Sequence, residues 1–122
     1  MINSDEPEAG KLLRHVPYNE GFHFFTDIGK YTGETSNGLE AFAKDIMVIE
    51  EASIRFHIQR GDFQKWIGNT IGDKVLAERL GRVDPQLPVD NLRKELVKVV
   101  QTRIVELTHQ LLQHRQKHHH HL

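Results

Sequence analysis

Histidines are the side chains in this sequence best suited to proton transfer near neutral pH. Five precede the histidine run at the C-terminus: His15, His23, His57, His109 and His114. His23 lies on the polar side of a predicted strand, and His57 lies one helical turn after Ser53. With Asp27 or Asp62 they could form an acid–base pair or a metal site. No two of the five are four residues apart, and no carboxylate motif of the metalloprotease kind is present, so a structural role is favoured for both.

Other reactive patterns are absent from the sequence. The lack of cysteine excludes a disulfide framework, a thiolate zinc site and a cysteine nucleophile. The segment from Gly29 to Gly33 has neither the glycine spacing nor the Lys-Ser/Thr ending of a phosphate loop. Arg60-Gly61-Asp62 spells an adhesion tripeptide, but helix-end signals explain these residues fully. We therefore expect no cofactor, no metal and no catalytic residue.

Length and composition predict one soluble domain. The chain has 122 residues, 38% of them hydrophobic, which is enough for a single core. No apolar run reaches the roughly 20 residues of a membrane span, and no signal peptide follows Met1, so we expect a cytoplasmic protein without membrane contact. We divide it into a disordered acidic lead-in over 1–10, a globular domain over 11–115, and an added histidine tail over 116–122.

The N-terminal third predicts a β-hairpin followed by a helix. Phe22 to Ile28 is rich in aromatic and β-branched residues and reads as a strand. Gly29-Lys30 predicts a two-residue turn that leads into a second strand. Asn37, with Glu40 three residues later, resembles a capping box and predicts a helix over 38–48.

Glycine–aspartate pairs organise the middle of the chain. Gly61-Asp62 and Gly72-Asp73 each predict a helix end at the glycine and a helix start capped by the aspartate, and Gly81 with Asp84 follows a looser version of this pattern. Short helices over 63–71 and 74–80 follow. The segment over 50–60 alternates like a strand and also stacks like a helix, but Gly61 as its terminating residue favours the helix.

The last predicted helix runs over 91–114, with Asp90 as its N-cap. Its apolar positions recur with a mean step of about 3.7 residues, which suits packing on its own domain better than a coiled coil. Residues 91–117 carry six bases and two acids, a net charge of +4. The fold class is therefore α+β, mostly α, with about five helices and one small N-terminal hairpin.

Several spaced motifs resemble an uncharacterised domain family of archaea and bacteria. They begin with Phe22-His23-Phe24-Phe25-Thr26 and continue through Leu39-Glu40-Ala41-Phe42, Trp66-Ile67 and Leu76-Ala77-Glu78-Arg79-Leu80 to Val83-Asp84-Pro85. Members of this family occur alone or beside glycosyltransferase and trehalose- or maltose-type sugar enzymes. The resemblance implies a small, mostly helical domain and no reaction.

These observations leave three classes of function. We favour an interaction or regulatory domain that binds a protein partner or a second copy of itself. The surface expected to carry it lies on the last helix and the neighbouring segment 55–60, and its residues are Arg55, Arg60, Lys94, Val97, Lys98, Arg103 and Val105. A nucleic-acid or ribosome-associated factor rests only on the basic last helix. A small enzyme built on His23 and His57 is the least favoured.

Overall fold

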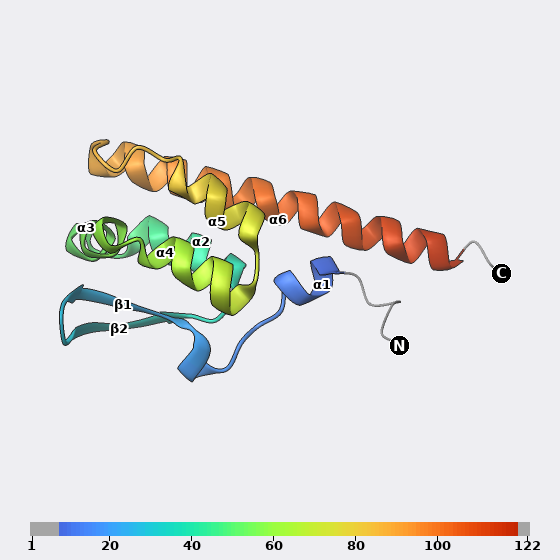
Figure 1. Cartoon of the computed structure of the whole chain (residues 1–122), viewed down its shortest axis with the longest axis horizontal. Coiled ribbons are helices and arrows are strands. Elements are labelled where there is room, and N and C mark those ends of the chain that lie inside the picture. The colour runs from blue at the N-terminus through green and yellow to red at the C-terminus, as the bar shows by residue number, and fades with distance from the viewer. Residues whose placement is uncertain (1–7, 120–122) are drawn as a thin grey trace.

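The computed structural model describes residues 8–119, with side chains through Arg115. Its elements are α1 (Glu8–Leu12), the 3-10 helix η1 (Tyr18–Glu20), β1 (Phe22–Asp27), β2 (Lys30–Ser36), α2 (Leu39–Val48), α3 (Glu51–Arg60), α4 (Asp62–Lys65), the π-helix η2 (Trp66–Ile71), α5 (Lys74–Gly81) and α6 (Val89–His119). The hairpin forms one layer, α2, α3 and α4 the next, and α5 with α6 the third (Figure 1). The predicted α+β class, mostly helical with an N-terminal hairpin and a long last helix, is confirmed.

β1 and β2 form a two-stranded antiparallel sheet. Phe22 lies opposite Ser36 at the open end, and Asp27 lies opposite Lys30 at the turn. The connecting residues are therefore Ile28 and Gly29, with Gly29 at a φ of 74°. The predicted Gly29–Lys30 turn was wrong by one residue, because Lys30 already pairs with β1. Register shifts on both sides of Phe25 free its N–H from the ladder for another partner.

The ambiguous segment 50–60 is helical. α3 ends at Gly61, whose φ of 69° places it in the left-handed region that lets a helix terminate without a Cβ clash. One further start signal was wrong, because α2 begins after Gly38 without any side-chain cap and Asn37 does not bond to the first turn.

The second glycine–aspartate junction behaves as predicted. Gly72 has a φ of 95°, and the Asp73 carboxylate accepts the Leu76 N–H at 3.0 Å as the cap of α5. The predicted helix over 63–71 is instead α4 followed by the wider η2. The third predicted junction, Gly81 with Asp84, differs from the other two. Gly81 is the last residue of α5 and does not have the positive φ of Gly61 and Gly72.

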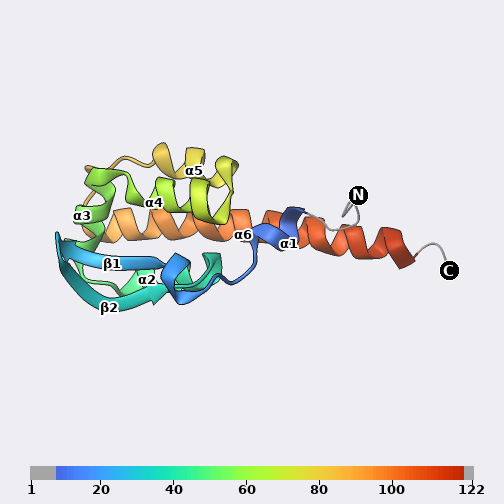
Figure 2. The same ribbon diagram turned by 60° about the horizontal axis from the view of Figure 1, so that its bottom comes forward.

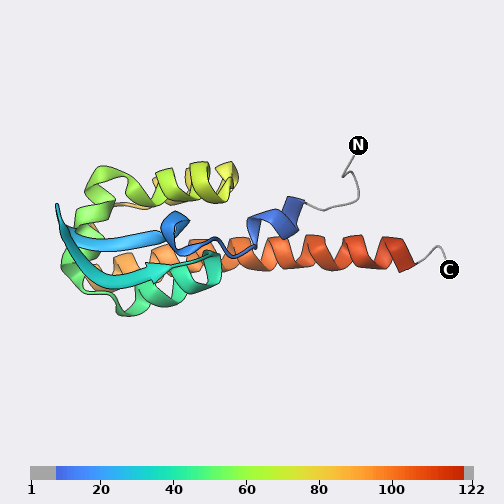
Figure 3. The same cartoon turned by 90° about the horizontal axis from the view of Figure 1, so that it is seen from below.

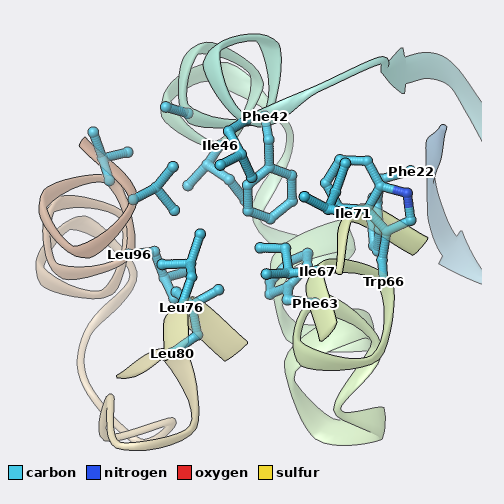
Figure 4. Packing of buried hydrophobic residues seen from close by; sticks show 14 of the residues in the cluster. Phe22, Phe42, Ile46, Phe63, Trp66, Ile67, Ile71, Leu76, Leu80 and Leu96 are labelled. Carbon is cyan, nitrogen blue, oxygen red and sulfur yellow. The ribbon is translucent and has the colours of Figure 1, made fainter. Parts of the chain in front are cut away.

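α6 is the longest element, about 46 Å at 1.5 Å per residue. It begins two residues before the predicted start, so Asp90 lies in its first turn rather than at its N-cap. Figures 2 and 3 show it as one straight rod whose C-terminal part extends beyond α1 and the rest of the body. Its N-terminal half covers a core built from all three layers, in which Phe42, Phe63 and Leu96 are buried (Figure 4).

The two ends differ in part from the predicted division. Residues 8–10 belong to α1, where Ala9 is buried, so the predicted disorder does not extend over them, and residues 1–7 lie outside the described part of the chain. Within the predicted tail, residues 116–119 continue α6, and 120–122 lie outside the described part. Of the helices in the described part, none combines the length and the apolar character needed to span a membrane.

Candidate functional site

A groove of about 450 Å³ separates the hairpin from α3. One wall is β1 with its turn, and the other is the C-terminal half of α3 with Asp62. Both histidines singled out in the sequence, His23 and His57, line it. The lining residues are Gly21, Phe22, His23, Phe25, Asp27, Ile28, Gly29, Phe56, His57, Arg60 and Asp62.

Both ring nitrogens of His57 are already bonded. Nε2 accepts the Phe25 N–H at 2.8 Å, so this nitrogen carries no proton. Nδ1 lies 2.8 Å from Asp62 Oδ2 and therefore donates its proton to the carboxylate. The ring is 4% exposed and contacts Phe22 and Phe56 edge-on. His57 thus fastens α3 to the freed amide of β1, which is a structural role.

Burial lowers the pKa of His57 below its ordinary value of 6.5, because desolvation disfavours the imidazolium, and the hydrogen bond and charge of Asp62 oppose this only in part. The neutral ring is also the form that its bonds require. A neutral imidazole without a free nitrogen has no lone pair for a substrate proton, so His57 is poorly placed for general-base work.

His23 belongs to a different group of polar side chains. Its Nδ1 lies 2.7 Å from Thr35 Oγ1, and Thr35 in turn bonds the Tyr31 hydroxyl. Tyr18 donates to Tyr31 at 3.0 Å, and its ring lies 4.9 Å from that of His23. The two histidines therefore share the groove but belong to separate hydrogen-bond networks.

Arg55 and Arg60 differ in how many of their guanidinium nitrogens are already hydrogen-bonded. Arg55 donates to the Pro85 and Leu87 carbonyls at 3.0 and 2.9 Å and so fastens the α5–α6 connection to α3. Arg60 donates through Nε to Asp62 at 3.0 Å and holds its guanidinium 4.8 Å from the centre of the Phe56 ring. The Asp62 carboxylate is occupied by His57 and Arg60, so the prediction that it caps the next helix was wrong.

Two of the predicted partner-binding residues on α6 are mostly buried. Val97 is 8% exposed and packs in the domain's own core. Arg103 is 9% exposed and makes two bonds to Asp73, at 2.8 and 3.2 Å. We therefore remove Arg103 from the candidate surface, whereas Val97, although mostly buried, lines a surface hollow together with Lys94 and Lys98. Arg103 is buried because it lies on the same face of α6 as the buried residues Val100 and Leu107.

Arg103 belongs to a network of four charged side chains, together with Asp73, Arg79 and Glu106. Its Nη1 donates to Glu106 at 3.1 Å, and Arg79 donates to both Glu106 oxygens at 3.0 and 2.9 Å. Burial alone would lower the pKa of Arg103, but its bonds to Asp73 and Glu106 outweigh burial and raise that pKa. The Arg79 hydrogen bond lowers the pKa of Glu106; burial opposes this, and the hydrogen bond from Arg103 adds to the lowering. This network holds α5 against α6.

The remaining predicted residues on α6 lie on an exposed face shared with α2, which we call the α2–α6 face. Lys94, Lys98 and Val105 line one hollow of about 370 Å³ together with Met47, and an adjoining hollow of about 360 Å³ adds Glu40 and Lys44. Val105 and Gln101 line both hollows. The contributions of α2 were missed, because sequence periodicity does not show which helix lies beside α6.

Known proteins resemble this chain at the level of one family. Residues 19–122 match the family described as Family of unknown function (DUF5752), and the chain belongs to it. The match includes the histidine-rich C-terminal residues. No curated protein and no solved structure matches the chain significantly. Among the described residues, no group of three or more histidine, aspartate or glutamate side chains is arranged to hold a metal ion.

Proposed function

We propose that this member of the DUF5752 family is a non-catalytic interaction domain whose α2–α6 face binds an acidic, amphipathic segment of another protein. The observation that supports this most strongly is the pairing of exposed apolar side chains with free lysines on one face. Val105 is 67% exposed and Met47 49% exposed, and the two line the same hollow, so they form part of one apolar patch. A partner would remove this apolar area from water.

Charge selects the kind of partner. Lys44, Lys94 and Lys98 line the two hollows with one acid, Glu40, and none of the three lysines forms an ion pair within the described residues. An acidic segment would gain these three cations without breaking existing pairs. Such charge complementarity raises the association rate and selects against basic partners.

The alternatives have less support. A nucleic acid would use the same lysines, but the face carries apolar side chains and no aromatic ring on which a base could stack. An enzyme built on His23 and His57 conflicts with the two occupied nitrogens of His57. A cytoplasmic location stays a prediction from the sequence. The occurrence of relatives beside sugar enzymes stays an implication of the family resemblance.

A peptide titration tests the proposal. The probe is an amphipathic helical peptide of about five turns with leucines on one face and glutamates on its flanks, compared with the same peptide carrying lysine for glutamate. In ¹H–¹⁵N spectra of the whole domain, we expect saturable shifts at residues 40–48 and 94–105 with the acidic peptide only. Shifts with the basic peptide, or none with either, would contradict the proposal.

Charge-reversal variants and the dependence of binding on salt distinguish an acidic protein partner from a nucleic acid and from self-association. Lys94→Glu with Lys98→Glu should abolish binding of the acidic peptide, whereas Lys11→Glu with Lys65→Glu, which changes charge equally on other exposed elements, should not. Tighter binding of a single-stranded RNA than of the peptide, with a steep loss as salt rises, would favour the nucleic-acid reading instead. A dimer by light scattering that the first pair of substitutions dissociates would assign the face to self-association and overturn the acidic partner.

A further inference from the structure

We propose that the groove between the hairpin and α3 is a binding site for a small aromatic carboxylate, because Arg60, with unused donors beside the Phe56 ring, and the Phe25 ring line the same groove. This site lies on β1 and α3 and shares no residue with the α2–α6 face. The two proposals therefore stand or fall separately.

The groove has the size and lining of a small-molecule site. Its volume of about 450 Å³ falls within the roughly 300–1,000 Å³ typical of ligand pockets. Phe25 and Phe56 are partly exposed to it, and Ile28, at the hairpin turn, is 79% exposed. A flat apolar ring would cover these three side chains and remove their exposed area from water.

Arg60 supplies the group that would recognise an anion. Of its five N–H donors, only Nε has a partner in the described part of the chain, the Asp62 carboxylate. The other four donors form the planar fork that fits a carboxylate with two parallel bonds. Asp62 and the Phe56 ring hold the guanidinium from two sides, so the fork is ordered before a ligand arrives.

Two carboxylates, Asp27 and Asp62, also line the groove and bear on which charge of ligand it can bind. Asp62 is committed to His57 and Arg60, but Asp27 uses Oδ1 only for the adjacent Ile28 N–H. Its negative charge opposes an anionic ligand, although Lys30 lies opposite it across the hairpin. A site for an amine would use Asp27 instead of Arg60. The two possibilities predict opposite responses to removal of each charge.

One buried ring ties the two walls of the groove together. His57 bonds β1 through the Phe25 N–H and bonds Asp62 through its other nitrogen, so the two walls and the acid that orients Arg60 are fixed by one buried ring. A rigid site loses little conformational freedom on binding.

Three ligands with the same ring test the charge preference on the whole domain: 2-naphthoate, 2-naphthylmethanol and 2-naphthylmethylamine. We expect saturable amide shifts at residues 21–29 and 56–62, with the carboxylate binding about tenfold more tightly than the alcohol, the size expected of one charge-assisted pair. Equal or tighter binding of the amine, shifts elsewhere, or no saturation would overturn the proposal.

Two substitutions sharpen the test. Arg60→Gln should reduce the affinity for the carboxylate to that for the alcohol and leave the alcohol's affinity unchanged, whereas Arg82→Gln, at the exposed residue that follows α5, should change neither. Asp27→Asn should tighten binding of the carboxylate a few-fold. Thermal melts check that each variant is folded. A carboxylate affinity that survives Arg60→Gln in a folded domain, or that falls with Asp27→Asn, would overturn the assignment.

Discussion

Gly61-Asp62 and Gly72-Asp73 follow the same local pattern, yet their carboxylates serve different purposes. Both glycines adopt left-handed backbone conformations at the end of a helix. Asp73 is 1% exposed, caps α5 and pairs with Arg103 inside the molecule. Asp62 caps nothing and orients His57 and Arg60 at the edge of the groove. The local pattern determines the backbone, and the surrounding tertiary structure determines what the carboxylate binds.

We call the Gly61-Asp62 and Gly72-Asp73 junctions the Asp62 corner and the Asp73 corner. The largest loss of stability should come from breaking the buried ion pair between Asp73 and Arg103 at the Asp73 corner. Arg103→Ala leaves Asp73 in the core with a negative charge and without its cation, and should lower the free energy of unfolding by about 3–5 kcal/mol. Denaturant unfolding measures this loss. Arg82→Ala removes an ion pair whose two side chains are both about 70% exposed and should cost under about 0.5 kcal/mol. Equal losses in the two variants would contradict the assigned burial.

At the Asp62 corner, His57→Ala should lower the free energy of unfolding by about 2–3 kcal/mol, since it leaves the Phe25 N–H unpaired and a space among the surrounding rings.

The stability of the Asp62 corner should also depend on pH. The pKa of His57 is lowered by folding, so the unfolded chain takes up the proton first and the folded state loses stability as the pH falls below about 6.5.

Unfolding measured at pH 5.5 and 7.5 checks the sign of this response. The wild-type domain should be less stable at pH 5.5, and His57→Gln should show a smaller difference between the two pH values. An unchanged difference in that variant would show that another group causes it. Arg82→Gln should keep the full difference, because Arg82 forms an exposed ion pair with Glu78 and leaves His57, Asp62 and Asp73 untouched.

The two glycines should behave alike where the two aspartates differ. A Cβ at position 61 meets no atom within 4 Å, and one at position 72 meets only Leu12 at 3.9 Å. The cost of Gly61→Ala and of Gly72→Ala is therefore conformational and should be about 1–2 kcal/mol in both. Unfolding midpoints that fall for one variant and not the other would contradict the shared backbone role.

The smallest effect concerns Ser53 on α3. Its hydroxyl is fully buried and has no hydrogen-bond partner, the one such side-chain atom among the described residues. Ser53→Ala removes an unsatisfied polar group with little change in volume, and should stabilise the domain by up to about 1 kcal/mol. Ser53→Val, which adds volume to the same site, is the comparison and should destabilise it. A loss of stability in the alanine variant would reveal a partner for the hydroxyl.

The sequence predicted backbone features well and side-chain partners poorly. The glycines at 61 and 72, the helical choice for 50–60 and the hairpin follow from local preferences that persist in the fold. The partners of Asp62 and Arg103 were missed because they depend on tertiary packing. One signal was present, since Leu96, Val100, Arg103 and Leu107 follow one another in steps of four, three and four residues, which places Arg103 on the buried stripe of α6.

The groove and the α2–α6 face illustrate the same limit. Arg60 and His23 line the same groove only because α3 folds against β1, although the two residues are more than 30 positions apart in the sequence. Met47 and Val105 meet because α2 packs on α6. Contacts of this kind depend on the tertiary arrangement, so a search for motifs with short spacing could name single residues such as Lys94 and Val105 but could not assemble the surface.

Double-mutant cycles at the two corners test the central claim most directly, because they measure each pair apart from the cost of each single change. One cycle combines Asp73→Ala with Arg103→Ala, and the other combines Asp62→Ala with Arg60→Ala. Burial predicts a coupling energy of about 2–3 kcal/mol for the first pair and under about 1 kcal/mol for the second, where Arg60 is half exposed. Equal coupling energies, or a larger one at Asp62, would show that burial does not separate the two corners.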